Sequence, residues 1–290
     1  MVIYDLLVAP FAEFEFMRRA LVGAVAIALG GAPVGVFLML RRMSLTGDAM
    51  AHAILPGAAL GYLVAGLSLP AMTLGGILAG TLVAVSAGLV ARFTALKEDA
   101  SLAAFYLISL ALGVTLVSAK GSNVDLLHVL FGTVLALDDA ALILLAGIAT
   151  VTLATLAILF RPLVLECVDP TFLRSVSRAG GPTHLVFLGL VVLNLVGGFQ
   201  ALGTLLAVGL MMLPAAASRF WSADVTAMIA IATALAIVSG ALGLVLSYHA
   251  ELPSGPAIIL VAGAAYLVSM ALGREGGLLW LARPGKHLEA

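Results

Sequence analysis

The sequence predicts an all-α polytopic membrane protein with eight or nine, and at most ten, transmembrane helices. Its composition predicts this class. Hydrophobic residues make up 63% of the 290 residues and charged residues only 10%, and the mean hydropathy is +1.20. A soluble domain carries about a quarter charged residues, so this chain has too little charge to cover a surface in water. Disordered chains, fibrous repeats and ordinary cytosolic enzymes are therefore excluded.

The net charge and the cysteine content exclude further kinds of site. The formal net charge is −1, whereas a nucleic-acid-binding protein presents a basic surface. We therefore expect no nucleic acid partner. The single cysteine, Cys167, excludes a disulfide framework and a cysteine metal cluster.

Long apolar runs supply the candidate spans in chain order. A helix needs about 20 apolar residues to cross a bilayer. Nine runs approach or reach this length: 20–40, 50–67, 71–91, 102–118, 140–160, 184–199, 201–218, 224–247 and 256–272. The two runs between 184 and 218 lie close together, so the count extends from eight to ten. We expect residues 1–275 to form a single transmembrane domain, followed by a polar C-terminal tail, 276–290.

Lysine and arginine residues predict the orientation, because they are retained on the cytoplasmic side of a membrane. With nine spans, most of them fall on the side that holds the C-terminus. The exceptions are Arg18, Arg19 and Lys120. We therefore expect a multi-pass protein with an outer N-terminus and a cytoplasmic C-terminus.

Small residues and prolines inside the spans predict a closely packed bundle. Glycines four residues apart allow helices to approach closely in lipid. They occur in three spans, as Gly31 and Gly35, Gly57 and Gly61, and Gly76 and Gly80. A proline kinks a helix and frees a carbonyl that protein or water must satisfy. Three spans contain one: Pro33, Pro56 and Pro214.

Asp48 and His52 are the polar residues that most need an explanation. They lie in the stretch 43–57, MSLTGDAMAHAILPG, at the start of an apolar helix. Most other acids, Glu166 among them, fall in predicted loops or tails, where we expect them to be solvated. A spacing of four residues places Asp48 and His52 on one face of a helix. An ionisable residue within a span is costly, so it implies a partner or a function.

A carboxylate oxygen and an imidazole nitrogen together suit zinc, manganese or ferrous iron. Two ligands are too few for a tight site, but a two-fold dimer would bring two pairs together and supply four. The alternative is that Asp48 and His52 bond each other or cap a half-helix after Gly47. We favour metal contact, because burying these groups for a cap alone is expensive.

Three other polar residues are weaker candidates for metal contact. His128 lies in a predicted short amphipathic helix on the outer side, and His249 and Glu251 lie in a predicted outer loop. Each could meet a metal ion on its way in, although ordinary surface positions explain them better.

The predicted cytoplasmic segment 166–181 has the signals of a short helix between two spans. Asp169 can act as the N-cap with Pro170 at the first helical position, and Gly180 provides a C-terminal stop. Phe172 is an aromatic residue on a helix otherwise exposed to water. The alternatives are a surface for a docking partner and a well-ordered loop; the length and Phe172 favour docking.

Motifs for chemistry within the chain are missing. The sequence has no G-x-x-x-x-G-K-[ST] phosphate loop, and its three lysines occur in no such context. It also has no serine triad signature, H-E-x-x-H motif or cysteine pair. We therefore expect no catalysis and no ATP hydrolysis by this chain.

The sequence resembles the integral membrane permeases of bacterial metal-ion ABC importers, the zinc, manganese and iron uptake class. The resemblance extends from about Phe16 to Gly273. Its most specific stretches are LRRMSLTGDAMAHAILPG at 40–57, VLFG at 129–132, VDPTF at 168–172, GTLLAVGLMMLPAA at 203–216 and LPSGP at 252–256.

The resemblance implies a homodimer in the bacterial inner membrane, a cytoplasmic ATPase subunit on each protomer and an extracytoplasmic metal-binding protein. It implies a fold like that of vitamin B12 and siderophore importers, with one helix fewer at the N-terminus. Asp48 and His52 match the family's metal-contacting residues. The segment from Asp169 to Gly180, with Pro170, Phe172 and Arg174, matches its coupling helix.

We therefore expect a permease for a divalent metal ion, zinc, manganese or iron, with no tightly bound cofactor and with ATP on the partner subunit. Membrane lipid surrounds such a protein. The alternatives are a secondary, proton-coupled metal carrier, in which Asp48 would be the proton-linked acid, and a membrane scaffold without transport. The scaffold leaves the Asp48 and His52 pair unexplained.

Overall fold

The computed structural model describes residues 2–66, 68–94, 98–119, 137–169, 172–173, 175, 177 and 180–281. The regular structure in these residues is helical, which confirms the predicted class. The helices are α1 (Val2–Leu7), α2 (Ala9–Glu13), α3 (Glu15–Leu40), α4 (Ser44–Ala53), α5 (Leu55–Ala65), α6 (Leu69–Phe93), α7 (Glu98–Ala119), α9 (Asp139–Val168), α11 (Gly180–Leu202), α12 (Thr204–Ser218), α13 (Val225–Ala250), α14 (Ser254–Leu272) and α15 (Leu278–Leu281).

The apolar helices follow the predicted spans in chain order. Within the described ranges, seven helical segments are long and apolar enough to cross a membrane, and two shorter apolar helices accompany them. One of the seven, Ser44–Ala65, consists of α4 and α5. The protein is therefore a multi-pass membrane protein with seven to nine apolar helices in this part of the chain. One predicted boundary is wrong: α9 continues past residue 160 to Val168 and accommodates Pro162 inside the helix.

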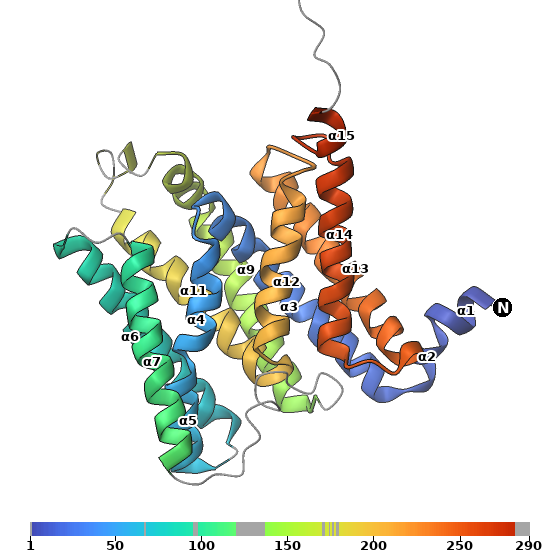
Figure 1. Ribbon diagram of the computed structural model, residues 1–290, viewed down its shortest axis with the longest axis horizontal. Coiled ribbons are helices and arrows are strands. Elements are labelled where there is room, and N and C mark those ends of the chain that lie inside the picture. The colour runs from blue at the N-terminus through green and yellow to red at the C-terminus, as the bar shows by residue number, and fades with distance from the viewer. Residues whose placement is uncertain are drawn as a thin grey trace, which may run out of the picture.

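The helices form a bundle with two neighbouring cores. Figure 1 shows α5, α6 and α7 on one side and α13 and α14 on the other, with α3, α9, α11 and α12 between them. One core surrounds Phe37 and Phe187, and the other contains Leu210, Ala236 and Ile258. The central helices α3 and α11 are the most enclosed of the long spans.

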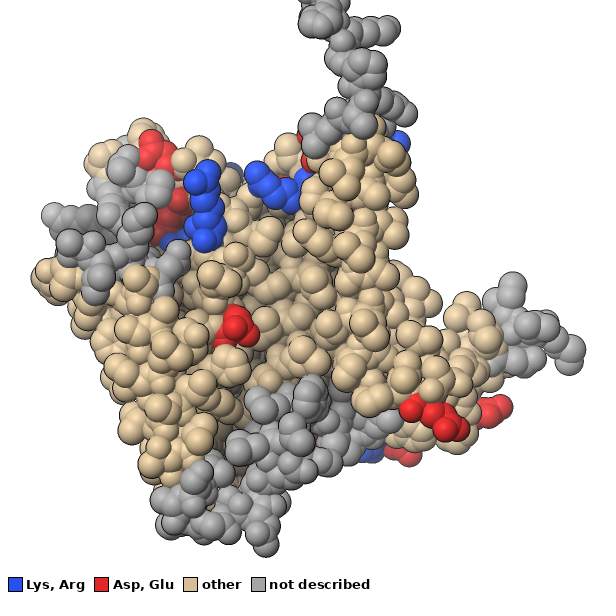
Figure 2. Space-filling model, in the orientation of Figure 1, with Lys and Arg blue, Asp and Glu red and all other residues tan. Residues whose placement is uncertain are grey.

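Polar contacts mark the two ends of the bundle. At one end, Arg41 after α3 contacts Glu166 near the end of α9; we call this the Arg41 end. Figure 2 shows basic side chains along the upper edge of the molecule, where α14 ends. At the opposite end, Arg19 pairs with Glu15 at 2.9 Å and with Asp139 at 3.1 Å. These acids balance the charge of Arg19, one of the exceptions to the predicted distribution of basic residues.

Glycines bring helix backbones together, as their spacing predicts. A Cβ on Gly57 in α5 would overlap the carbonyl of Gly75 in α6, and a Cβ on Gly35 in α3 would overlap the carbonyl of Met211 in α12. Small residues of this kind allow such close packing in lipid. The approach of α5 to α6 fixes the far end of the broken helix that carries Asp48 and His52.

Candidate functional site

Asp48 and His52 lie inside α4, a short helix that begins just after the Arg41 turn. The chain leaves α3 through Arg42, whose φ is 58°, and α4 runs from Ser44 to Ala53. At 1.5 Å rise per residue, Asp48 lies about 6 Å and His52 about 12 Å along the helix from Ser44. The N-cap position of α4 is Met43. Asp48 therefore does not cap this helix.

A break separates α4 from α5 directly after His52. Pro56 at the start of α5 has no N–H to donate to the preceding turn. The hydroxyl of Ser109 in α7 donates a hydrogen bond to the carbonyl oxygen of Ala53 at 2.8 Å. The protein thus satisfies the backbone at the break with a side chain from a neighbouring helix, and the position of α4 depends on α7.

The two side chains lie on one face, as their spacing predicts. Asp48 Oδ1 and His52 Nε2 are 3.9 Å apart, and the side chains are 69% and 31% exposed on the protomer. Two ligands of one tetrahedral ion at about 2.0–2.1 Å would lie about 3.3 Å apart. A small side-chain rotation therefore brings both atoms to one metal ion. The inner nitrogen of His52, Nδ1, is buried, which leaves Nε2 as the outward-facing ligand atom.

The described part of one protomer offers an incomplete set of metal ligands. Among the described residues, no three His, Cys, Asp or Glu side chains lie close enough to hold one ion. The tilted ring of Tyr106 in α7, 6.4 Å from the His52 ring, covers one side of the pair. Further ligands for an ion at this pair therefore have to come from outside the described residues of this protomer.

The weaker candidates lie apart from this pair. His249 at the end of α13 bonds the carbonyl of Leu6 at 3.0 Å, and Glu251 follows it in the left-handed conformation. This corner belongs to the end of the bundle where α3 begins, because Phe14 stacks against Tyr248. Asp48 follows the opposite end of α3. His128 lies outside the described residues.

The described part of the predicted docking segment shows the predicted cap. Asp169 Oδ1 accepts a hydrogen bond from the backbone N–H of Phe172 at 2.9 Å. Phe172 is exposed and Leu173 is buried, so the segment presents an aromatic side chain outward. Pro170 and Arg174 lie outside the described residues. Gly180 is not a helix stop, because it is the first residue of α11; Ser177, three residues earlier, already lies outside a helix.

Glu166 is buried, which corrects the prediction of a solvated loop acid. Its carboxylate bonds the guanidinium of Arg41 at 3.0 Å, and both side chains are less than a tenth exposed. The same guanidinium contacts His184 Nδ1 in α11. The extension of α9 to Val168 carries Glu166 into the bundle. Glu166 and His184 lie 125 and 143 residues from Arg41 in sequence, so the spacing of these residues could not predict their contacts.

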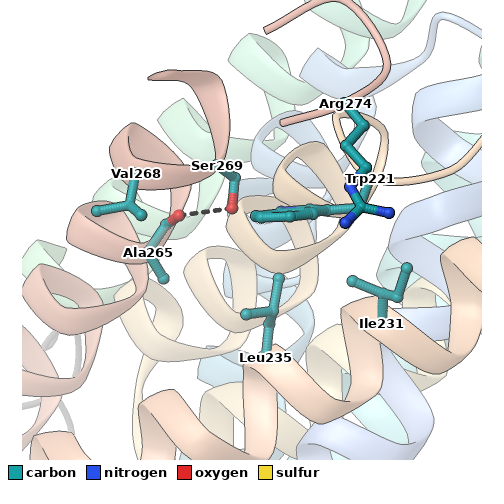
Figure 3. Close-up of a pocket in the computed structure, with 7 residues that line it drawn as sticks. All are labelled: Trp221, Ile231, Leu235, Ala265, Val268, Ser269 and Arg274. Carbon is teal, nitrogen blue, oxygen red and sulfur yellow. Dashed lines mark hydrogen bonds between the residues drawn. The ribbon is translucent and has the colours of Figure 1, made fainter. Parts of the chain in front are cut away.

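A separate cavity of about 520 Å³ lies between α13 and α14 at the Arg41 end. Figure 3 shows Ile231 and Leu235 of α13 opposite Ala265 and Val268 of α14, with Trp221 and Arg274 at the top. Arg274 is the one ionisable residue in this lining, and a cation repels a metal ion. The lining contains no carboxylate, imidazole or thiol, so this cavity is not the metal site.

Known proteins similar to this chain identify its family. The model of the ABC 3 transport family matches residues 13–273. The manganese import system permease protein ScaB of Streptococcus parasanguinis is 32% identical over 257 residues, 89% of this chain and 90% of that protein.

Two solved structures share the fold. PsaBC from Streptococcus pneumoniae in complex with Fab superposes with a TM-score of 0.84 at 28% identity, over 97% of this chain and 99% of that one. The inward-facing structure of a metal-chelate type ABC transporter superposes with a TM-score of 0.70 at 15% identity, over 87% and 84% of the two chains. This second likeness confirms the predicted class of importer fold. The chain therefore belongs to the ABC 3 transport family, as a multi-pass membrane permease and not as an enzyme.

Proposed function

We propose that the protein is the permease subunit of an ATP-driven importer of a divalent metal ion, with manganese as the first candidate. The observation that carries the proposal is the pair of Asp48 and His52 on an open face of the broken helix α4–α5. A carboxylate and an imidazole on such a face would provide ligands for a passing cation. The manganese import permease at 32% identity supports this choice of cargo.

The incomplete ligand set supports a homodimer. Each protomer supplies two ligand atoms that face outward, so two copies related by a two-fold axis would supply four to one ion. Four ligands suffice for a transition metal, and two of them belong to each side of the pathway. The ion is cargo, and its affinity has to be moderate, because a site that binds too tightly does not release.

The Arg41 end is the cytoplasmic end in this proposal. The distribution of arginines supports it, as does the capped helix start at Asp169, which presents Phe172 for contact with a partner. That partner is a cytoplasmic ATPase subunit, because the chain has no phosphate loop of its own. An extracytoplasmic metal-binding protein delivers the ion at the opposite end. Closure of the ATPase dimer displaces the segment 169–180 and reopens the pathway toward the cytoplasm.

Transport by the reconstituted complex of permease and ATPase tests the proposal. We expect ATP-dependent uptake of manganese into liposomes by the wild type, and at least about a tenfold loss in Asp48→Asn and His52→Gln, since each removes half of a protomer's ligands. Glu13→Gln is the matched control, because Glu13 is an exposed acid at the other end of the bundle. Competition by zinc and iron in the same assay ranks the three metals.

Two results would contradict the proposal. Normal manganese uptake by both Asp48→Asn and His52→Gln, in assembled dimers, removes the site. Uptake driven by a pH gradient without ATP identifies a proton-coupled carrier, the alternative in which Asp48 carries the proton.

A further inference from the structure

A cluster of three ionisable side chains, of which Arg41 and Glu166 are buried, joins three helix ends at the Arg41 end of the bundle. Arg41 Nη2 bonds Glu166 Oε1 at 3.0 Å and contacts His184 Nδ1. His184 Nδ1 is itself 3.7 Å from the same carboxylate oxygen. The guanidinium lies over the ring of Phe187, 4.9 Å from its centre. We call Arg41, Glu166 and His184 the charge joint.

The three residues of the charge joint flank the two functional segments. Glu166 lies in the last turn of α9, three residues before Asp169, where the docking segment begins. His184 lies in the second turn of α11, four residues after Gly180, where that segment ends. Arg41 immediately precedes the turn into α4, the helix of Asp48 and His52. One guanidinium thus holds both flanks of the docking segment to the start of the metal-site helix.

The connection from Arg41 to α4 is stiff. The N–H of Met43 bonds the carbonyl of Leu38 at 2.9 Å, and the N–H of Arg42 bonds the carbonyl of Met39 at 3.1 Å. With Arg42 in the left-handed conformation, this pattern is the Schellman motif that ends many helices. A displacement of the Arg41 side chain therefore moves α4 as well, because the turn between them is held by these hydrogen bonds.

Stability alone is a poor reason for this cluster. A buried ion pair usually contributes little or nothing relative to apolar residues of the same volume, because desolvation opposes the attraction. Here Arg41 Nη1 and Glu166 Oε2 are buried, and neither has a hydrogen-bond partner among the described residues. The cost of desolvation is then only partly offset. What the cluster does supply is one specific arrangement of three helix ends.

We propose that the charge joint transmits movement of the docking segment to α4, which makes Arg41 a positioning residue for transport. The proposal rests on the function proposed above, because it requires that the segment after Glu166 receives the ATPase. One nitrogen of the Arg41 guanidinium, Nη2, bonds Glu166 and contacts His184 at once. Movement of either flank therefore pulls on the same side chain and, through the stiff turn, on Asp48 and His52.

The test separates coupling from stability by replacing the cluster with apolar residues. We expect the single variant Glu166→Leu to assemble poorly, since it leaves the Arg41 charge buried without its carboxylate. The double variant Arg41→Met with Glu166→Leu restores assembly with the ATPase. In that assembled complex, we expect the ratio of manganese transported to ATP hydrolysed to fall about tenfold, as for the loss of a typical coupling between sites.

Two further variants complete the design. Arg41→Lys keeps a charge beside Glu166, but the lysine side chain ends one bond short of Nη2 and loses the contact with His184, so we expect an assembled complex with a lowered ratio. The control replaces Thr152 by Val and Asn194 by Leu, a buried hydrogen-bonded pair that joins the same helices, α9 and α11, at 2.8 Å. That pair does not touch Arg41, and we expect the control to keep the wild-type ratio.

A wild-type ratio of transport to ATP hydrolysis in the assembled double variant or in Arg41→Lys overturns the proposal. A lowered ratio in the control overturns it as well, because any buried polar pair would then have the same effect. Failure of the proposed function looks different, since the wild-type complex itself would then show no ATP-dependent manganese uptake.

Discussion

At the scale of single residues, one hydroxyl group supports the break in the helix that carries Asp48 and His52. Replacing Ser109 by Ala leaves the buried carbonyl of Ala53 without its donor. We expect a loss of about 1–3 kcal/mol in the free energy of unfolding, measured as a lower midpoint of thermal unfolding in detergent. The affinity for manganese should also fall, because α4 loses its support beside His52.

Thr115→Ala is the matched control for this substitution. Thr115 lies on the same helix, α7, but its exposed hydroxyl bonds the carbonyl of Ala111 in its own helix at 2.7 Å. The Ala111 carbonyl already lies within the hydrogen-bonded helix, so removing the Thr115 hydroxyl costs little stability. Equal unfolding midpoints for Ser109→Ala and Thr115→Ala would contradict a special role of the break.

Residues marked by a local sequence pattern could be predicted, whereas residues that depend on the packing of distant helices could not. Asp48 and His52 could be predicted because a local pattern, two ionisable residues one turn apart in an apolar run, already demands an explanation. Glu166 could not. It stands near several charged residues that look like an ordinary loop, and only the packing of α3, α9 and α11 brings Arg41 to its carboxylate. The spacing of Asp48 and His52 likewise did not predict which side of the bundle Asp48 faces.

At the scale of helices, close backbone contact holds α5 against α6. Replacing Gly57 by Ala places a methyl group where the carbonyl of Gly75 lies. We expect a loss of about 1–3 kcal/mol in the free energy of unfolding from overpacking, read as a lower unfolding midpoint. Because α5 continues from α4, manganese transport should fall with it.

Gly88→Ala is the control at this scale. Gly88 lies in α6, and a Cβ there would meet no atom within 4 Å. Since alanine favours a helix over glycine by about 1 kcal/mol, this variant should be as stable as the wild type or slightly more so. A stable Gly57→Ala variant would show that α5 and α6 separate without cost.

Helix boundaries were predictable where composition changes sharply, and not elsewhere. Apolar runs of about 20 residues gave the spans, because a bilayer core fixes the length of a crossing helix. The close pair of runs near 200 is explained by Gly203, which ends α11 at a φ of 91° and permits a second helix at once. The end of α9 was misplaced because Arg161 and Pro162 look like a boundary, while the helix runs through both.

At the scale of the whole molecule, the exposed Asp48 side chain requires a partner surface. A charged side chain that is 69% exposed on a membrane protomer is costly against lipid, so a second copy or a water-filled path must cover it. The proposed two-fold dimer would satisfy this demand by placing one pair of ligands opposite the other. The same arrangement would complete the set of metal ligands that the described residues of one protomer leave incomplete.

Cross-linking between protomers measures this arrangement directly. In a Cys167→Ser background, which removes the chain's own thiol, we expect Asp48→Cys to form a covalent dimer with a short bifunctional thiol reagent. Val238→Cys is the control, because Val238 is 52% exposed on α13, on the side of the bundle away from α5 to α7 (Figure 1). It should react with a monofunctional maleimide yet stay monomeric with the bifunctional reagent. If Asp48→Cys reacts with maleimide and still gives no covalent dimer in the complex with the ATPase, the two pairs do not face each other, and each protomer must then complete its metal site with other ligands.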